Sequence, residues 1–209
     1  MIRPPPLAPG DVVRVIAPAG PFDPDRFERG LAVLRDRLGL RPRFREDIAS
    51  RAGYLAGPDP RRAAEWREAV EDEAASAIFC ARGGYGSMRI LPAIDPRPLL
   101  DSPKLFMGFS DVTAIHASLN RAGLCTVHGP GVAQLALLPD EALEHLRELL
   151  YGEAPPPSMD APPKPGAGLA GDETIRPGRA SGPLLGGNLT LLSHLAGTRY
   201  LPSLDGAIL

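Results

Sequence analysis

Short apolar runs alternate with amphipathic helical patterns along most of this chain, and the alternation is the feature that most constrains its fold. Runs of strand character occupy residues 11–20, 76–86, 104–110 and 125–131, and helical spacing of apolar residues fills the segments between and after them. Strands that alternate with helices indicate a parallel sheet covered on both faces. We therefore predict a doubly wound, flavodoxin-like α/β domain over residues 1–151.

Two of the expected helices carry a recognisable start signal. Asp23 and Asp59 are each followed directly by proline. Aspartate is a favoured helix cap, and proline is favoured at the first helical position. We expect a helix to begin at each of these pairs.

Composition excludes several classes of function. The net charge is −2 with no basic block, which gives no reason to expect nucleic acid or a membrane surface as a partner. No apolar run reaches the length of a signal sequence or a membrane span. Cys80 and Cys125 lie in apolar runs and read as reduced core residues, so we expect a cytoplasmic protein without a metal site.

The pattern changes after residue 151. Residues 152–178 are rich in proline and glycine without helical or strand periodicity, and we interpret them as a linker. Residues 179–209 then read as the incomplete start of a second domain, with an apolar helix around Leu189 to Leu195. The chain ends on the apolar residues 206–209, as if a strand were just beginning. We therefore expect the sequence to be cut short.

Ligands of open α/β sheets bind beyond the carboxyl ends of the strands. This rule selects candidate site residues without reference to any family. Pro18, Ala19 and Gly20 follow the first expected strand. The candidates after the other three expected strands are Arg82, Gly83, Gly84, Tyr85, Gly86, Ser110, Asp111, His128, Gly129 and Pro130.

Ser110 has two compatible interpretations, because it lies where an apolar strand changes into a helical pattern. Serine is a favoured helix cap. It is also a nucleophile in α/β hydrolases, where a sharp turn presents it, although Val112 stands where their G-x-S-x-G pattern has its second glycine. The N–H of Asp111 at the helix start, and an N–H of the Gly83–Gly84 turn, could stabilise an oxyanion beside Ser110.

The other candidates have plainer readings. The RGGYG stretch at 82–86 lacks the G-x-G-x-x-G pattern, so nucleotide binding is weakly indicated and a tight turn suffices. We favour a core histidine over a site residue for His128. His116 and His145 read as ordinary helix residues, and His194 has no obvious carboxylate partner.

Four stretches together resemble the LD-carboxypeptidase family, the muramoyl-tetrapeptide carboxypeptidases. They are ARGGYGSMRIL, GFSDVTAIH, VHGP and LLGGNLTLLSHLAGTRYLPSLDGAIL, in this order along the chain. The resemblance implies a cytoplasmic serine peptidase that removes the terminal D-alanine from the murein tetrapeptide during cell-wall recycling. It also implies an N-terminal flavodoxin-like domain, a linker, a mainly β C-terminal domain, no cofactor or metal, and a homodimer when full length.

The resemblance assigns roles by position. It makes Ser110 the nucleophile and gives the oxyanion to the N–H groups of Asp111 and Gly84 (or Gly83). The strand-end crevice, whose other members are Arg82, Tyr85, His128 and Gly129, would then bind the muropeptide. The family's glutamate and histidine would fall beyond Leu209. Serine is a poor nucleophile without a general base, so the resemblance implies a nearly inert 209-residue chain.

Two other functions stay open from the sequence. A microcin-immunity-type hydrolase would use the same triad to cleave a peptidyl or aminoacyl nucleotide. A non-catalytic remnant would only bind muropeptide or nucleotide in the strand-end crevice.

Overall fold

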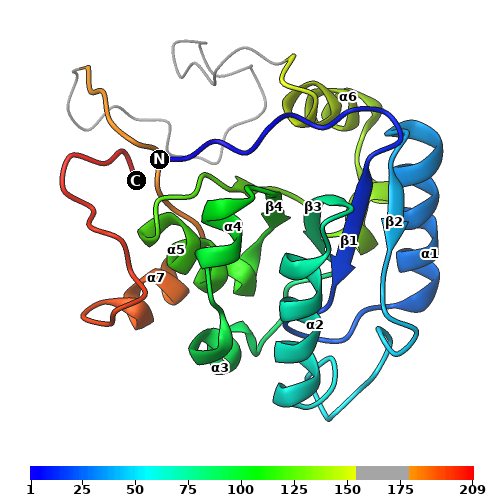
Figure 1. The fold of residues 1–209 in the computed structure, drawn as a ribbon, viewed down its shortest axis with the longest axis horizontal. Coiled ribbons are helices and arrows are strands. Elements are labelled where there is room, and N and C mark those ends of the chain that lie inside the picture. Colours follow the sequence, from blue (N-terminus) through cyan, green and yellow to red (C-terminus); the bar gives the residue numbers. More distant parts are fainter. Residues whose placement is uncertain (154–178) are drawn as a thin grey trace, which may run out of the picture.

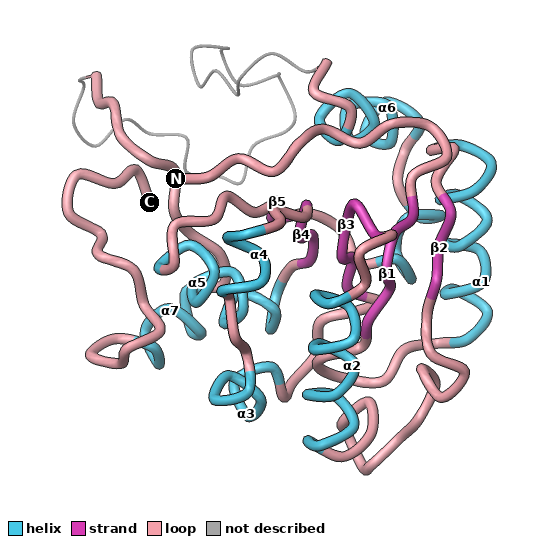
Figure 2. The backbone as a smooth tube through the Cα atoms, in the orientation of Figure 1, coloured by secondary structure: helices cyan, strands magenta, loops and turns pink. Residues whose placement is uncertain are grey.

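The computed structural model describes residues 1–153 and 179–209, and its centre is a parallel sheet of five strands in the order β2-β1-β3-β4-β5 (Figures 1 and 2). This order and the helices on both faces confirm the predicted doubly wound, flavodoxin-like fold. The strands are β1 (Val12–Ile16), β2 (Arg41–Arg43), β3 (Ala75–Cys80), β4 (Leu105–Gly108) and β5 (Val127–His128).

The edge strand β2 was not predicted. It has the sequence RPR and pairs in parallel with β1, Arg41 lying beside Val12. An edge strand can be short and can hold a proline, because one of its sides needs no ladder partner. It therefore carries neither the length nor the apolar character by which the other strands are found.

Two groups of helices cover the two faces of the sheet. On one face α1, η4 and α6 pack against the sheet, and on the other α2, α3, α4, α5 and α7 do so (Figure 1). The helices are α1 (Pro24–Ala32), α2 (Asp59–Glu71), α3 (Ser87–Ile90), α4 (Arg97–Asp101), α5 (Thr113–Arg121), α6 (Asp140–Leu150) and α7 (Leu189–Leu195), with a π-helical turn η1 (Val33–Arg37) and 3₁₀ turns η2 (Leu91–Ala93), η3 (Ser110–Val112) and η4 (Val132–Leu137).

The strand side chains divide between two cores because successive residues of a strand point to opposite faces. Phe79 of β3 lies in the core under α1, while Ile78 and Phe106 lie in the core under α2 and α5. Trp66 of α2 packs edge-on against Phe106 with ring centroids 5.7 Å apart. Each such buried side chain contributes about 1.5–3 kcal/mol of transfer free energy, so the sheet is a rigid base for the loops at its ends.

A helix begins at both predicted pairs, but only one of the two aspartates is the cap. Asp23 caps α1, its carboxylate accepting the Arg26 N–H at 2.9 Å. Asp59 is instead the first residue of α2, and the cap position is Pro58. The Asp59 carboxylate pairs with Arg62 and Arg89, because its hydrogen bonds to two charged guanidinium groups are stronger than hydrogen bonds to backbone N–H groups would be.

The last described segment joins the α/β domain. Helix α7 begins and ends where the sequence indicated, its Leu195 is buried in the α2/α5 core, and the Asn188 N–H donates to the Thr113 hydroxyl at 3.0 Å. Ile208 forms a parallel bridge with Leu184. Apart from residues 152 and 153, the predicted linker lies outside the described residues, so the domain boundaries stay predictions.

The two cysteines differ from each other. Cys80 is buried at the end of β3, as expected, whereas Cys125 is only partly buried. Cys125 lies just before the two-residue edge strand β5, and its N–H donates to the Ile2 carbonyl of the N-terminal segment at 2.8 Å. Its classification as a core residue was therefore wrong.

Candidate functional site

The structure places Ser110 in the turn between β4 and α5, the position expected from the sequence. Ser110 has φ = +60° and is the one non-glycine residue with positive φ in the described ranges 1–153 and 179–209. A non-glycine residue in the left-handed region costs on the order of 1 kcal/mol or more and persists where the surrounding structure imposes it. Such strain is typical of a nucleophile presented on a sharp turn.

The glycine before the turn is closely packed. A Cβ on Gly108 would lie 3.0 Å from both Cys80 Sγ and Val112 Cγ1, so a larger residue would require these side chains to shift by a few tenths of an ångström. Phe109 is fully extended, and the 3₁₀ turn η3 begins at the next residue. Burial raises the pKa of the Cys80 thiol well above its usual value, which leaves that neighbouring sulfur protonated and unreactive.

The helix-cap interpretation of Ser110 is wrong. The residues at the cap positions of η3 and α5 are Phe109 and Val112, and neither helix start is capped by a side chain. Ser110 is already inside the 3₁₀ turn. Its hydroxyl makes no hydrogen bond within the described part of the chain, so its side chain is not committed to the backbone.

The glycine turn after β3 lies directly against this serine. A Cβ on Gly83 would lie 2.9 Å from the Phe109 carbonyl oxygen and 3.0 Å from Ser110 Cβ. Only glycine allows two backbones to approach so closely. The predicted neighbourhood of the RGGYG turn and Ser110 is thus present in the fold.

The orientation of the Gly83–Gly84 peptide follows from a hydrogen bond that its carbonyl makes with the loop after β1. The Gly83 carbonyl accepts the Gly20 N–H at 3.0 Å. In a trans peptide the N–H points away from the carbonyl, so the Gly84 N–H points away from Gly20. Since β3 lies between β1 and β4, the side opposite the β1 loop is the side of Ser110. This orientation favours Gly84 over Gly83 as a donor toward the serine.

Asp111 is fixed by the start of α3. Its carboxylate accepts the Ser87 N–H at 2.8 Å, and the Ser87 hydroxyl donates to the Asp111 carbonyl. Both residues are buried. The Asp111 N–H belongs to the first turn of a helix, where N–H groups have no partner inside the helix. The side chain of Asp111 is thus structural, while its N–H is suited to an anion.

His116 has a role that sequence reasoning missed, although its place in the helix was expected. The buried ring joins the Gly108 carbonyl (Nε2, 2.7 Å) and the Thr126 hydroxyl (Nδ1, 2.8 Å). A carbonyl only accepts, so Nε2 carries the proton and Nδ1 accepts from Thr126. Burial lowers the pKa of His116 to about 4, which keeps the ring neutral. Both nitrogens are engaged, and the ring holds the end of β4 in place.

The remaining predicted residues lie at the same edge but differ in their surroundings. His128 is exposed, with its ring centroid 5.7 Å from that of His116, so the core interpretation of His128 is wrong. The Gly129 N–H donates to the Gly108 carbonyl at 3.1 Å and continues the sheet. Arg82 donates to the Pro21 carbonyl at 2.6 Å, so its side chain turns toward the β1 loop.

An aromatic pair stands beside the glycine turn. Tyr85 is 54% exposed and meets Tyr54, 64% exposed, edge-on with ring centroids 5.3 Å apart. Tyr54 was missed, because it lies in a loop far from the turn in sequence and carries no motif. Two exposed aromatic rings beside the glycine turn are suited to hold an apolar or planar group.

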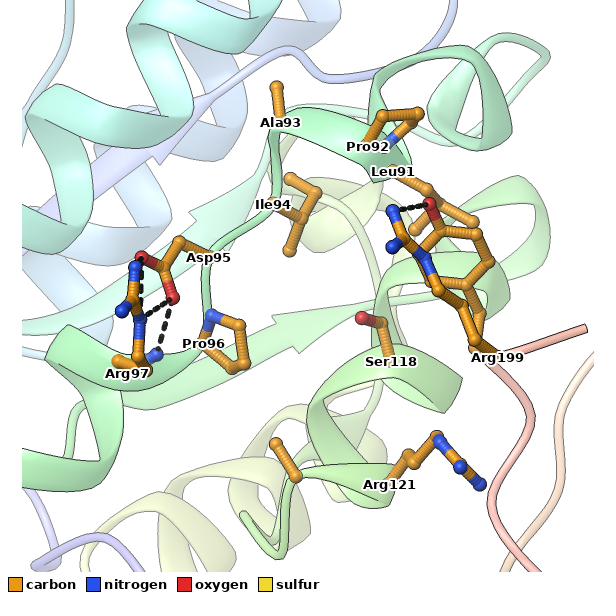
Figure 3. A pocket seen from close by; sticks show the side chains of 12 residues that line it. Leu91, Pro92, Ala93, Ile94, Asp95, Pro96, Arg97, Ser118, Arg121 and Arg199 are labelled. Atoms are coloured by element: carbon orange, nitrogen blue, oxygen red, sulfur yellow. Dashed lines mark hydrogen bonds and ion pairs between the residues drawn. The ribbon is translucent and has the colours of Figure 1, made fainter.

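An open pocket of about 560 Å³ lies away from Ser110. It is lined by η2 and the residues up to the start of α4, by the C-terminal end of α5, and by Arg199 and Tyr200, which follow α7 (Figure 3). None of the predicted site residues lines it. In the ranges 1–153 and 179–209, no group of three or more potential metal ligands occurs, and no helix has the length and apolarity that a membrane crossing requires.

These features define a class: a flavodoxin-like α/β protein with a strained serine in a strand-to-helix turn and a glycine turn packed against it. The comparisons identify the family within this class. The LD-carboxypeptidase N-terminal domain family matches residues 13–129, and the LD-carboxypeptidase C-terminal domain family matches residues 181–209. The chain belongs to the LD-carboxypeptidase family.

Individual proteins of this family and fold are similar to the chain over nearly its whole length. A putative carboxypeptidase of Streptomyces coelicolor is 40% identical over 100% of this chain and 66% of its own length. A probable murein peptide carboxypeptidase of Bacillus subtilis is 35% identical over 99% of this chain and 63% of its own. The crystal structure of an MccF-like protein from Bacillus anthracis has the same fold, with a TM-score of 0.83, 24% identity, and coverage of 99% of this chain and 68% of that one. The chain thus spans just under two thirds of the length of these two curated relatives.

Proposed function

We propose that the protein is a serine-type LD-carboxypeptidase that removes the terminal D-alanine from the murein tetrapeptide. The observation that carries the proposal is Ser110, held with φ = +60° against the Gly83–Gly84 turn. The B. subtilis relative, named a probable murein peptide carboxypeptidase, supports the substrate class.

The geometry supports attack by Ser110 Oγ on the carbonyl carbon of the bond before D-alanine. The carbonyl oxygen becomes an anion in the tetrahedral intermediate, and the N–H groups of Asp111 and Gly84 are the donors we assign to it. Fixed donors of this kind typically contribute a factor of about 10²–10³ each. Cleavage then releases D-alanine and leaves an acyl group on Ser110 for water to remove.

We assign the general base and its carboxylate to the family's histidine and glutamate, in the third of the relatives' length that this chain does not span. In the described residues no histidine hydrogen-bonds to Ser110, and both nitrogens of His116 are engaged elsewhere. We further propose a cytoplasmic location in cell-wall recycling, no cofactor, and a homodimer of the complete protein. Arg82, Tyr85, His128 and Gly129 then border the muropeptide crevice.

The test uses the protein of the complete reading frame and a murein L,D-tetrapeptide, with D-alanine release as the readout. Ser110→Ala should lower kcat by a factor on the order of 10⁶. Ser118→Ala, a serine of the same helix region remote from the turn, is the control and should leave kcat unchanged. The 209-residue chain should match Ser110→Ala. Full activity in the alanine variant would sink the proposal.

A second substrate in the same assay addresses the alternative. The structures of similar fold include a microcin C7 self immunity protein, and a likeness at 23% identity concerns the fold alone. Release of an amino acid or peptide from an aminoacyl or peptidyl nucleotide, without release of D-alanine from the tetrapeptide, would favour the immunity-type hydrolase.

A further inference from the structure

One buried charge beneath the candidate site has no part in the reaction just described. Arg62 of α2 is 0% exposed. Its Nη1 donates to the carbonyls of Pro18 and Gly86, the latter at 2.7 Å, and its Nη2 pairs with the Asp59 carboxylate. Pro18 follows β1 and Gly86 follows β3, so one guanidinium joins the loops after two neighbouring strands.

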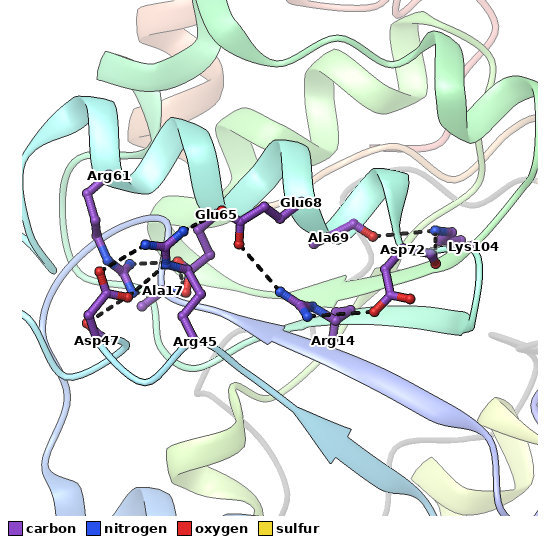
Figure 4. A network of polar contacts seen from close by, with 10 residues as sticks. All are labelled: Arg14, Ala17, Arg45, Asp47, Arg61, Glu65, Glu68, Ala69, Asp72 and Lys104. Atoms are coloured by element: carbon purple, nitrogen blue, oxygen red, sulfur yellow. Dashed lines mark hydrogen bonds and ion pairs between the residues drawn. The ribbon is translucent and has the colours of Figure 1, made fainter.

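Burying a guanidinium at this position of the helix carries a desolvation penalty. Removing such an ion from water costs several kcal/mol even after relaxation, and an apolar side chain of similar volume is often no less stabilising. One helical turn further on, Glu65 accepts the Ala17 N–H at 2.8 Å (Figure 4). Helix α2 thus binds two successive groups of the chain as it leaves β1: the Ala17 N–H and the Pro18 carbonyl.

These contacts bracket one particular peptide. Pro18 lies two residues before Gly20, whose N–H binds the Gly83 carbonyl at 3.0 Å, and Gly86 lies two residues after Gly84. Arg62 therefore closes a ring around the Gly83–Gly84 peptide. Gly86 has φ = +123°, and a Cβ there would lie 2.8 Å from Arg62 Nη1, so the turn and the guanidinium fit each other closely.

We propose that Arg62 is a positioning residue that fixes the direction of the Gly84 N–H toward Ser110. The inference rests on the proposed function, because it assigns a task within that reaction. Nη1 donates to both carbonyls while Nη2 is held by the Asp59 carboxylate, so the plane of the guanidinium fixes the directions of the two Nη1 N–H bonds. The flexible ammonium of lysine lacks this fixed geometry. Being fully buried, Arg62 acts through the turn and does not touch the substrate.

The test compares Arg62→Lys and Arg62→Met with Arg67→Met in the protein of the complete reading frame. Arg67 is an exposed arginine of the same helix and serves as the matched control. Four quantities are measured: kcat and KM for the tetrapeptide, the affinity for the tripeptide product, and the affinity for a peptide boronate. The boronate forms a tetrahedral anion on a reactive serine and so reports on the oxyanion donors, whereas the tripeptide reports on the crevice alone.

Both Arg62 variants should lower kcat about ten- to a hundredfold, part of the loss seen when one oxyanion donor is removed. Boronate affinity should fall by a similar factor, while KM and tripeptide affinity change by less than about threefold and Arg67→Met changes nothing. An unchanged kcat, or equal losses of boronate and tripeptide affinity, would overturn the proposal. So would unfolding of both variants at the assay temperature, seen by circular dichroism, since Arg62 would then serve folding. Ser110→Ala in parallel keeps the two proposals apart: activity in that variant removes the proposed function itself.

Discussion

Ser87 and Asp111 exchange hydrogen bonds with each other's backbone, although 24 residues separate them in sequence. The Asp111 carboxylate accepts the Ser87 N–H, and the Ser87 hydroxyl donates to the Asp111 carbonyl. Ser87 opens the helix after the glycine turn, and Asp111 follows Ser110. The exchange therefore ties the two segments that supply the proposed oxyanion donors into one unit.

Removing the Asp111 carboxylate should weaken this unit. In Asp111→Ala the buried Ser87 N–H loses its acceptor, and the free energy of unfolding should fall by about 1–3 kcal/mol in urea denaturation. Asp111→Asn keeps an acceptor oxygen and should lose clearly less. The exposed Asp36→Ala is the control and should change stability by less than about 0.5 kcal/mol. Equal losses for Asn and Ala would mean that the hydrogen bond is unimportant.

Relieving the strain at Ser110 should stabilise the protein. Ser110→Gly removes a left-handed backbone cost of about 1–3 kcal/mol and adds a glycine entropy cost of about 0.5–1 kcal/mol. The free energy of unfolding should therefore rise by about 1 kcal/mol, whereas Ser110→Ala, which keeps a Cβ, should bring no gain. Ser118→Gly inside α5 should instead lose about 1 kcal/mol. A destabilised Ser110→Gly would show that the turn is not strained.

The close approach of Gly83 to the serine turn should tolerate no side chain. Gly83→Ala places a methyl group 2.9 Å from the Phe109 carbonyl oxygen, so either the turn or Ser110 must move. We expect a loss of about 1–3 kcal/mol in thermal unfolding, together with a loss of activity. Gly186→Ala is the control, because a Cβ there meets nothing within 4 Å. A Gly83→Ala protein as stable as Gly186→Ala would contradict the observed packing.

His116 should make stability depend on pH. Its pKa is lowered to about 4 from an ordinary 6.5, mainly by burial and slightly by the nearby His128. The unfolded chain therefore binds a proton first as pH falls. The stability contributed by neutral His116, about 3 kcal/mol, is present above pH 6.5 and is lost between pH 6.5 and 4.

The comparison that isolates this effect is His116→Gln, which has no ionisable group. Urea unfolding between pH 7 and 4.5 should show a steeper loss in the natural protein than in the variant. Since carboxylates and His128 titrate in both proteins, only the difference between the two curves reports on His116. Parallel curves would mean that His116 is protonated in the folded state or does not titrate in this range.

Local patterns predicted much of the fold, because the hydrophobic periodicity of a strand or a helix can be recognised within a short stretch of sequence. The run into Gly108 and the helical spacing after Val112 located the turn at Ser110. The cap at Asp23 has a local cause as well, since the acceptor and the N–H it binds are three residues apart. By contrast, β2 exists only because β1 offers it a ladder edge, which its own three residues do not reveal.

The roles of side chains were predicted less well than the backbone. Asp59 has the sequence of a helix cap but lies within reach of Arg62 and Arg89, and charge pairing prevails over capping. His116 and Arg62 look like ordinary helix residues until the fold places backbone carbonyls in front of them. A partner that comes from another strand or loop leaves no trace in the local pattern, so these contacts required the structure.

The left-handed backbone at Ser110 has a consequence for anyone who engineers this protein. Glycine fits that conformation better than the residue that would perform the chemistry. A library ranked only by melting temperature would therefore be expected to replace the serine early, and its most stable members would lack the proposed nucleophile. Thermostability screens should therefore include, from the first round, an activity assay of the protein of the complete reading frame.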